Sequence, residues 1–258
     1  QLLEDTDMLF ITAGMGGGTG TGSSPVIAKI AKELGVLTVG IVTKPFGFEG
    51  GKRRANAEKG IEELKEFVDS LVVIPNDKLF ELPDKTITLQ NAFKEANNIL
   101  KIGIKGVADL MIGNGLINLD FADIKTTMQN SGIAVLGFGE GEGENRAIKA
   151  TEKALMSPLL EKSISGASKI LLNIAGSSDL TLMEAQSIAN IVKDAAGKSA
   201  DDVMFGVNLN EDLKDGIQVT IIANNFVDTV EKNEPFINVA INKTEEQKEE
   251  SKEDAEEK

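Results

Sequence analysis

The sequence predicts an α/β fold: a parallel sheet in the first third, a long central helix, and a smaller α+β region after it. Three observations support this prediction. Apolar segments rich in β-branched residues recur about thirty residues apart in the first third, with a helical pattern between them. One uninterrupted helical pattern of more than twenty residues follows. Beyond it, strand and helix patterns alternate less regularly, as in an α+β domain.

The expected strands of the parallel sheet are Met8–Thr12, Thr38–Thr43 and Leu71–Pro75. Their apolar residues run almost without interruption, which is typical of strands buried on both faces. One helix is expected from Ser24 to Leu34, with Pro25 in its first turn and Gly35 as its stop. A second is expected over Ala55–Phe67. The βαβαβ order favours right-handed crossovers.

The central helix is expected from Leu89 to Met111, because apolar residues recur there at helical spacing. Gly103 and Gly106 weaken the helix, so a bend or break near them stays open. The Gly113–Gly115 segment ends it.

The second half contains four expected strands and two expected helices. The strands are Ile133–Phe138, Lys169–Ile174, Val203–Val207 and Ile217–Ala223, and the helices are Arg146–Met156 and Leu182–Ala196. The polar Asn208–Gly216 connection predicts a hairpin between the last two strands. From Lys243 onward the chain is rich in Glu and Lys without large apolar residues, which predicts a disordered tail.

Composition excludes several kinds of chemistry. The 258 residues contain no Cys and no His, so disulfides, thiolate metal sites and a histidine base are ruled out. The net charge of −14 argues against nucleic acid and anionic membranes as partners. No apolar run is long enough to span a membrane, and the first residues do not resemble a signal peptide, so a cytoplasmic protein is expected. Gln1 is not a methionine, so we expect the natural N-terminus to be missing.

The strongest functional signal is the glycine-rich segment Gly14–Gly22, between the first strand and the first helix. Six of its nine residues are glycine, which lets backbone N–H groups approach an anion closely. The following helix N-terminus adds partial positive charge, and Thr19 and Thr21 add hydroxyl groups. The segment lacks the lysine of a Walker loop and the spacing of a dinucleotide loop, so a dehydrogenase is disfavoured. We therefore expect a phosphate-binding loop of another type.

This loop resembles the signature loop of the tubulin and FtsZ superfamily. Three further blocks, Thr43–Gly50, Ile74–Leu79 and Asn118–Asp123, narrow the resemblance to the FtsZ family of tubulin-like GTPases. The resemblance covers Asp5 to about Phe226, in the family's own order. A plasmid-segregation or archaeal relative is an alternative within the superfamily, which the Asn118–Asp123 block weakly disfavours.

The resemblance implies a GTPase that binds GTP with Mg²⁺ and assembles head to tail into protofilaments of the bacterial division ring. It implies four regions: the C-terminal portion of the GTP-binding domain (1–88), the central helix (89–112), the synergy loop with the C-terminal α+β domain (113–227), and an acidic tail (228–258). Implied partners are further copies of the chain, ring accessory proteins and membrane tethers at mid-cell. Neither nucleic-acid binding nor direct membrane insertion is implied.

The resemblance also assigns candidate site residues. The implied nucleotide contacts are Gly16, Gly17, Gly18, Thr19, Gly20, Thr21, Glu49, Arg53, Phe93 and Asn97. Phe93 would stack on guanine and Asn97 would read its edge, although one amide oxygen matches guanine's two donors less well than a carboxylate. The implied catalytic group is Asp120 and Asp123 with Asn118 beside them, supplied by a neighbouring subunit.

Each of these residues also has a simpler interpretation. Asp120 and Asp123 fit an N-cap and an acidic first helical turn. The basic Lys52–Arg54 segment fits a solvated helix start, and Phe93 on an apolar stripe fits a core position. Two carboxylates beside a γ-phosphate can nevertheless orient a water or a cation, because phosphoryl transfer depends more on positioning than on a strong base.

The resemblance begins part-way through the family's GTPase domain, with roughly three βα units absent. We therefore expect an exposed apolar sheet edge, with weak GTP binding and poor folding for this chain alone. The family's C-terminal partner-binding peptide is not seen either. A second hypothesis is a nucleotide-incompetent fragment that only caps protofilaments through its acidic loop.

Overall fold

The computed structural model describes residues 3–81, 88–112, 115–157, 159–160, 162–197 and 202–226. In this part of the chain, seven strands form one mixed sheet in the order β1-β2-β3-β4-β7-β5-β6. The strands are β1 Met8–Gly14, β2 Leu37–Lys44, β3 Ser70–Pro75, β4 Gly132–Glu142, β5 Ala167–Gly176, β6 Asp202–Leu209 and β7 Gly216–Phe226. The helices are α1 Thr19–Glu33, α2 Gly51–Lys65, α3 Leu89–Ile112, α4 Phe121–Met128, α5 Arg146–Leu155 and α6 Leu182–Ala196. The predicted fold class is confirmed.

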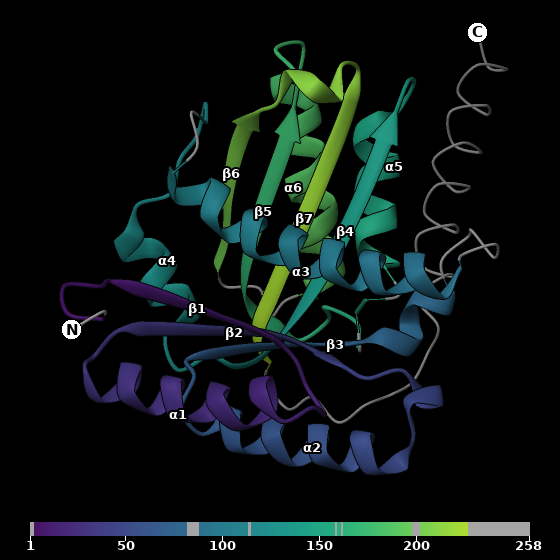
Figure 1. Cartoon of the computed structure of the whole chain (residues 1–258). Helices are drawn as coiled ribbons and strands as arrows, with labels where there is room; N and C mark the ends of the chain where they lie inside the picture. Colours follow the sequence, from purple (N-terminus) through teal and green to yellow (C-terminus); the bar gives the residue numbers. More distant parts are fainter. Residues whose placement is uncertain are drawn as a thin grey trace, which may run out of the picture. The chain divides into compact units, whose positions relative to one another are not determined.

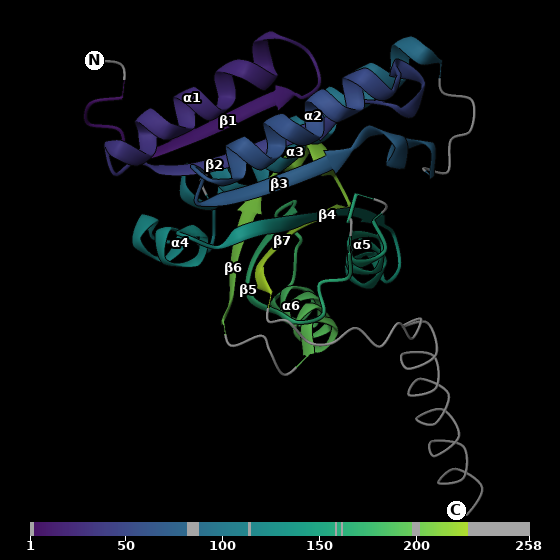
Figure 2. The same cartoon turned by 90° about the horizontal axis from the view of Figure 1, so that it is seen from below.

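Strands β1, β2 and β3 pair in parallel, as the βαβαβ order predicts. Helices α1 and α2 cover one face of these strands, and α3 lies against the other (Figures 1 and 2). Almost every residue of β2 is buried, which explains its continuous apolar sequence. One boundary was predicted wrongly: α1 begins at Thr19, so Pro25 lies in its second turn rather than its first. Gly35 does end this helix, with a φ of 74°.

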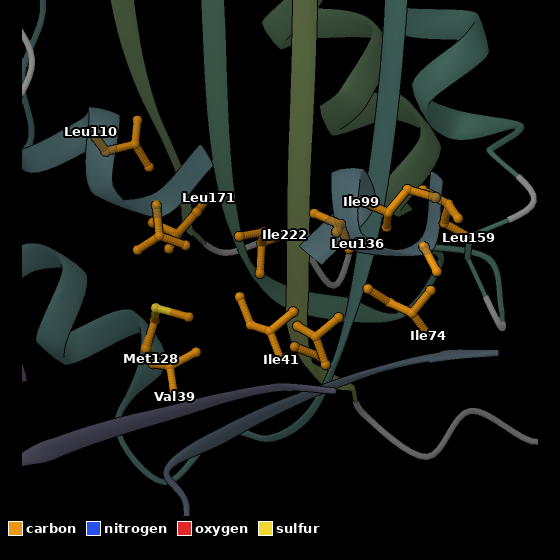
Figure 3. Packing of buried hydrophobic residues seen from close by; sticks show 14 of the residues in the cluster. Val39, Ile41, Ile74, Ile99, Leu110, Met128, Leu136, Leu159, Leu171 and Ile222 are labelled. Carbon is orange, nitrogen blue, oxygen red and sulfur yellow. The ribbon is translucent and has the colours of Figure 1, made fainter. Parts of the chain in front are cut away.

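Helix α3 packs between the two parts of the sheet, where its apolar side chains meet those of β2, β4, β5 and β7 (Figure 3). It is continuous across Gly103 and Gly106, so the break left open by the sequence does not occur. Both glycines serve close packing instead. A Cβ at Gly106 would lie 2.7 Å from Cγ2 of Thr220, and one at Gly103 would lie 3.1 Å from Cδ2 of Leu136. The two glycines let α3 approach the sheet closely.

Strand β4 belongs to both parts of the sheet. Its first residues, Gly132–Ala134, pair in parallel with β3, and Val135–Glu142 pair antiparallel with β7. The predicted hairpin between the last two strands is wrong, because β5 lies between β6 and β7. β6 pairs with β5 in parallel, and β7 pairs antiparallel with β4 and β5. These four strands form the second part of the sheet, which α5 and α6 cover (Figure 1).

Strand β1 lies at the end of the strand order and pairs on one side only within the described residues. Beside it, α1 exposes four large apolar side chains: Val26, Ile27, Ile30 and Leu34. The expected apolar edge is therefore present. The predicted acidic tail and the Gly113–Asn114 end of the central helix lie outside the described residues. In the part described, none of the helices has the length and apolar character needed to cross a membrane.

Candidate functional site

The glycine loop follows β1 directly and leads into α1. Its backbone is fixed internally, because the Gly16 N–H donates to Oγ1 of Thr21 at 2.8 Å. Thr21 is buried, so Gly16 and Thr21 have a structural role in the loop, and their predicted contact with a nucleotide stays a prediction. The N–H groups of Gly17 and Gly18 have no acceptor among the described residues, and the space beside both α-carbons is open.

These free donors adjoin the first turn of α1, whose first N–H groups also lack intrahelical partners. Thr19 and Gly20 form the start of that turn. Backbone donors without acceptors and the helix N-terminus therefore lie next to one another beside open space, which suits an oxyanion such as a phosphate.

The first turn of α2 forms one wall of the loop. Gly16 has a φ of 104°, and a Cβ there would lie 2.7 Å from the Arg53 carbonyl oxygen, so both the conformation and the contact require glycine. Arg53 also pairs with Glu49, with 3.2 Å between Nε and Oε2. The Glu49 side chain is only 11% exposed, while that of Arg53 is 52% exposed. This pair holds the Nε end of the Arg53 guanidinium, while about half of the side chain stays exposed.

The loop between β2 and α2 is held from two sides. Oε1 of Glu49 accepts the N–H of Phe46 at 2.9 Å, and Oδ1 of Asp77 accepts the N–H of Gly47 at 2.8 Å. Asp77 lies in the Ile74–Leu79 block, which the sequence singled out without assigning it a role. The hydrogen bond to Gly47 gives Asp77 a structural role, because it connects the segment after β3 to the loop that carries Glu49.

Phenylalanines cluster around Phe46 at the same end of the sheet. The buried Phe46 ring stacks on Phe48 with centroids 5.0 Å apart and meets Phe93 edge to face at 5.3 Å. Phe93 is 42% exposed, and Asn97 follows one turn later on α3, also exposed. An exposed aromatic face next to an exposed amide suits a planar base, so the predicted roles of Phe93 and Asn97 stay open predictions supported by their position.

The acidic group lies beyond the other end of α3. Asp120 occupies the N-cap position of α4, but its side chain makes no capping hydrogen bond, and Asp123 lies in the first turn. Both are exposed. The amide of Asn118 donates to the Gly115 carbonyl at 3.4 Å, and the Leu119 N–H donates to the Leu110 carbonyl. The N-cap position that the sequence allowed is occupied, and the Asp120 carboxylate is left free for another partner.

The two groups of candidate residues are far apart in one copy of the chain. From Phe93 to Ile112 at the end of α3, the helix rises about 28 Å, and the acidic group follows that end. The loop, Glu49, Arg53 and Phe93 therefore form one site, and Asp120 and Asp123 cannot reach it from within the same chain.

The sequence did not single out three residues that shape this site. Phe46 links Glu49 to Phe93, Asp77 holds Gly47, and the Asn56 amide bonds to the glycine loop. Phe46 and Asp77 lie inside the blocks that carry the family resemblance, so the signal was available. An exposed helical residue such as Asn56 gives no comparable signal.

Comparisons with known proteins agree with this arrangement. Residues 1–84 match the GTPase domain of the Tubulin/FtsZ family, and residues 132–227 match the C-terminal domain of the FtsZ family. A solved FtsZ dimer from M. jannaschii, described as empty, matches with a TM-score of 0.83 and 41% identity, covering 92% of this chain and 72% of that one. A mutant M. jannaschii FtsZ matches with a TM-score of 0.83 and 44% identity, covering 87% of this chain and 67% of that one.

More distant structures share the fold alone. CetZ1 from Haloferax volcanii, solved as a GDP-bound monomer, matches with a TM-score of 0.71 and 22% identity, covering 88% of this chain and 67% of that one. CetZ2 from the same organism, solved as a GTPγS-bound protofilament, matches with a TM-score of 0.69 and 20% identity, covering 98% of this chain and 72% of that one. Given the FtsZ matches above 40% identity and both matched domains, the chain belongs to the FtsZ family of tubulin-like GTPases.

Proposed function

We propose that this chain carries the phosphate and base contacts of a GTP site that is completed by the acidic loop of a second copy. The observation that carries the proposal is the placement of the two candidate groups at opposite ends of α3. Copies stacked head to tail bring the Asp120 and Asp123 end of one copy onto the glycine loop of the next. Hydrolysis is then coupled to assembly into a protofilament.

The residues fit the chemistry of phosphoryl transfer. Free N–H groups of Gly17 and Gly18 would compensate charge on the phosphates, and Arg53 would add a cation. The incoming carboxylates of Asp120 and Asp123 would orient the attacking water, which needs positioning more than a strong base. The M. jannaschii dimer and the H. volcanii protofilament support self-association as the working state.

Mg²⁺ fits as an ion held mainly by the nucleotide. Among the described residues, no cluster of three or more metal-binding side chains is present, so a protein cage for a cation is absent there. Mg²⁺ commonly binds through phosphate oxygens, water and one or two carboxylates. When bound, it would neutralise charge on the β- and γ-phosphates, and Asp120 or Asp123 would be the carboxylates nearest to it.

At the level of the cell, the proposed role is that of a cytoplasmic division-ring polymer at mid-cell that acts in septation. Accessory proteins and membrane tethers would be its further partners. Membership of the FtsZ family supports this role, as do the two matched domains along the chain.

The test is GTP-dependent sedimentation combined with phosphate release, on the purified chain and on an Asp120→Asn/Asp123→Asn variant. At GTP concentrations high enough to offset the weak binding expected of this chain alone, we expect the parent to pellet and to release phosphate only with GTP. The variant should still pellet with GTP while phosphate release falls about a hundredfold or more, because its interface forms without the carboxylates. Equal phosphate release by both proteins would contradict the proposal.

A second candidate function is protofilament capping without hydrolysis. The free edge of β1 and the exposed apolar stripe of α1, formed by Val26, Ile27, Ile30 and Leu34, favour it, because they leave one side of the glycine loop open in the described residues. Titrating the chain into a filament-forming FtsZ separates the candidates. Capping predicts inhibition of pelleting at substoichiometric amounts, whereas copolymerisation predicts pelleting of both proteins.

A further inference from the structure

One face of α2 follows the glycine loop along its length. Arg53, Asn56 and Gly60 lie on this face at helical spacing. A Cβ at Gly16 would clash with the Arg53 carbonyl oxygen, and a Cβ at Gly60 would clash with the Thr21 side chain. Between these two contacts, the Asn56 side chain reaches the loop itself. Helix α2 therefore supports the glycine loop along this face.

The Asn56 amide makes two hydrogen bonds to the loop. Its Nδ2 donates to the carbonyl oxygen of Gly16 at 2.9 Å and to that of Gly17 at 2.9 Å. Both N–H bonds of one amide group are thus used on consecutive carbonyl groups, 40 and 39 residues away in the sequence. No other side chain in the described residues is recorded donating to these two oxygens.

The geometry of the peptide bond gives these contacts a consequence. All peptide bonds described here are trans, and in a trans peptide the carbonyl and the following N–H point in opposite directions. Holding the Gly16 carbonyl towards α2 therefore turns the Gly17 N–H away from α2. Holding the Gly17 carbonyl turns the Gly18 N–H the same way. These are the two donors without an acceptor among the described residues, and the space beside the α-carbons of both glycines is open.

We propose that Asn56 is a positioning residue that aims the Gly17 and Gly18 N–H groups at the phosphates of a bound nucleotide. The inference rests on the proposed function, which supplies the nucleotide. Consecutive glycines have wide backbone freedom, so an untethered loop would lose entropy on binding an anion. A loop already held in the binding orientation avoids that cost. Asn56 need not touch the nucleotide to raise its affinity.

The test measures the affinity of guanosine, GDP and GTP for the parent, Asn56→Ala, Asn56→Asp and Asn56→Gln by calorimetry. The Asp variant keeps the shape but replaces two donors by a carboxylate facing two carbonyl oxygens. We expect the Ala and Asp variants to lose about tenfold in GDP and GTP affinity, equivalent to about 1.4 kcal/mol, with guanosine affinity and Tm unchanged. Gln keeps both donors and should recover most of the loss.

The matched control is Asn190→Asp, an exposed asparagine on α6 far from the loop in the fold. It should bind all three ligands like the parent. Parental GDP affinity in the Asn56→Asp variant would overturn the inference. So would a guanosine loss equal to the GDP loss, or a fall in Tm that accounts for it, since either would show a merely structural role.

A second measurement is independent of the nucleotide. Backbone ¹⁵N order parameters of Gly16–Gly18 in the unliganded chain should fall from about 0.85 to below about 0.6 in Asn56→Ala, but not in Asn190→Ala. Unchanged values in Asn56→Ala would overturn the inference. If the parent binds no nucleotide while the order parameters fall as expected, the proposed function fails and the tether by Asn56 stands.

Discussion

The glycine loop and the surroundings of Arg146 use hydrogen bonds in opposite ways. At the loop, the backbone N–H groups of Gly17 and Gly18 have no acceptor in the described part of the chain, and the space beside their α-carbons is open. At the far end of the second sheet, the Arg146 guanidinium makes five hydrogen bonds, to both carboxylate oxygens of Glu184, to the Asp179 carboxylate and carbonyl, and to the Asp215 carbonyl. All five guanidinium donors are therefore satisfied.

The difference separates binding from stability. The Arg146 side chain is only 10% exposed and joins α5, α6 and the turns around them, so its hydrogen bonds stabilise the fold. These bonds, chiefly the one to Glu184, raise the pKa of Arg146 and lower the pKa of Glu184 to about 2. The unpaired donors of the loop stabilise the fold only when an anion is bound to them. Changes in the two regions should therefore affect different measurements.

The largest expected effect comes from Gly18→Val. The backbone of Gly18 is in the right-handed helical region, which valine tolerates, and the space beside it is open. The new side chain should occupy the phosphate position and lower GTP affinity about a hundredfold or more, equivalent to about 2.8 kcal/mol. Calorimetry measures the affinity, and urea unfolding should show an unchanged free energy. A variant that unfolds more easily but binds GTP normally would show that Gly18 serves stability rather than binding.

The reciprocal change is Arg146→Met. The substitution leaves the Glu184 and Asp179 carboxylates without their cation. Both carboxylates still reach solvent, so the free energy of unfolding should fall by about 2 kcal/mol, which is less than for a fully buried pair. Urea denaturation measures it. Nucleotide affinity should match that of the parent. A loss of affinity at unchanged stability would contradict the assignment of Arg146 to stability.

Gly106→Ala tests the helix that connects the two regions. Helix propensity alone predicts stabilisation by about 1 kcal/mol. We expect destabilisation by about 1 kcal/mol instead, because the added methyl group meets the buried Thr220 side chain at 2.7 Å and overpacks the contact. The matched control is Gly51→Ala at the start of α2, where nothing lies within 4 Å. Stabilisation of both variants would show that the contact between α3 and Thr220 can accommodate an added methyl group.

The smallest effect concerns acid. The pKa of Glu184 is lowered from 4.5 to about 2 in the fold, so its contribution is present above the unfolded-state pKa and is lost as pH falls towards 2. After allowance for solvent screening, the parent should lose about 1 kcal/mol between pH 5 and pH 3 from this group. Urea unfolding across this range should show less acid sensitivity in Arg146→Met. Identical pH profiles would contradict the assignment.

The sequence predicted most elements because their signals are local. The bounds of α6 were predicted without error: Thr181 and Glu184 form a capping box at its start, and Gly197 follows its end. The predicted β6–β7 hairpin was wrong because β5 lies between the two strands. The residues that connect β6 to β7 do not determine which strand each of them pairs with. Long-range contacts decide such cases.

The candidate site divides in the same way. The glycine loop was found from its own composition and position after a strand. Asp77 acts through one hydrogen bond and Asn56 through two, to residues 30 to 40 positions away, which no local pattern reveals. The family resemblance supplied Phe93, which on periodicity alone is an ordinary core position.

The central claim is that one copy holds the nucleotide and another completes the site, and mixing two inactive variants tests it most directly. Gly18→Val lacks a working loop but keeps its aspartates, whereas Asp120→Ala/Asp123→Ala keeps its loop but lacks them. Each alone should release almost no phosphate from GTP. The mixture should release far more phosphate than the sum of the two, because an interface between the intact loop of the second variant and the intact aspartates of the first is complete. Phosphate release equal to that sum would contradict it.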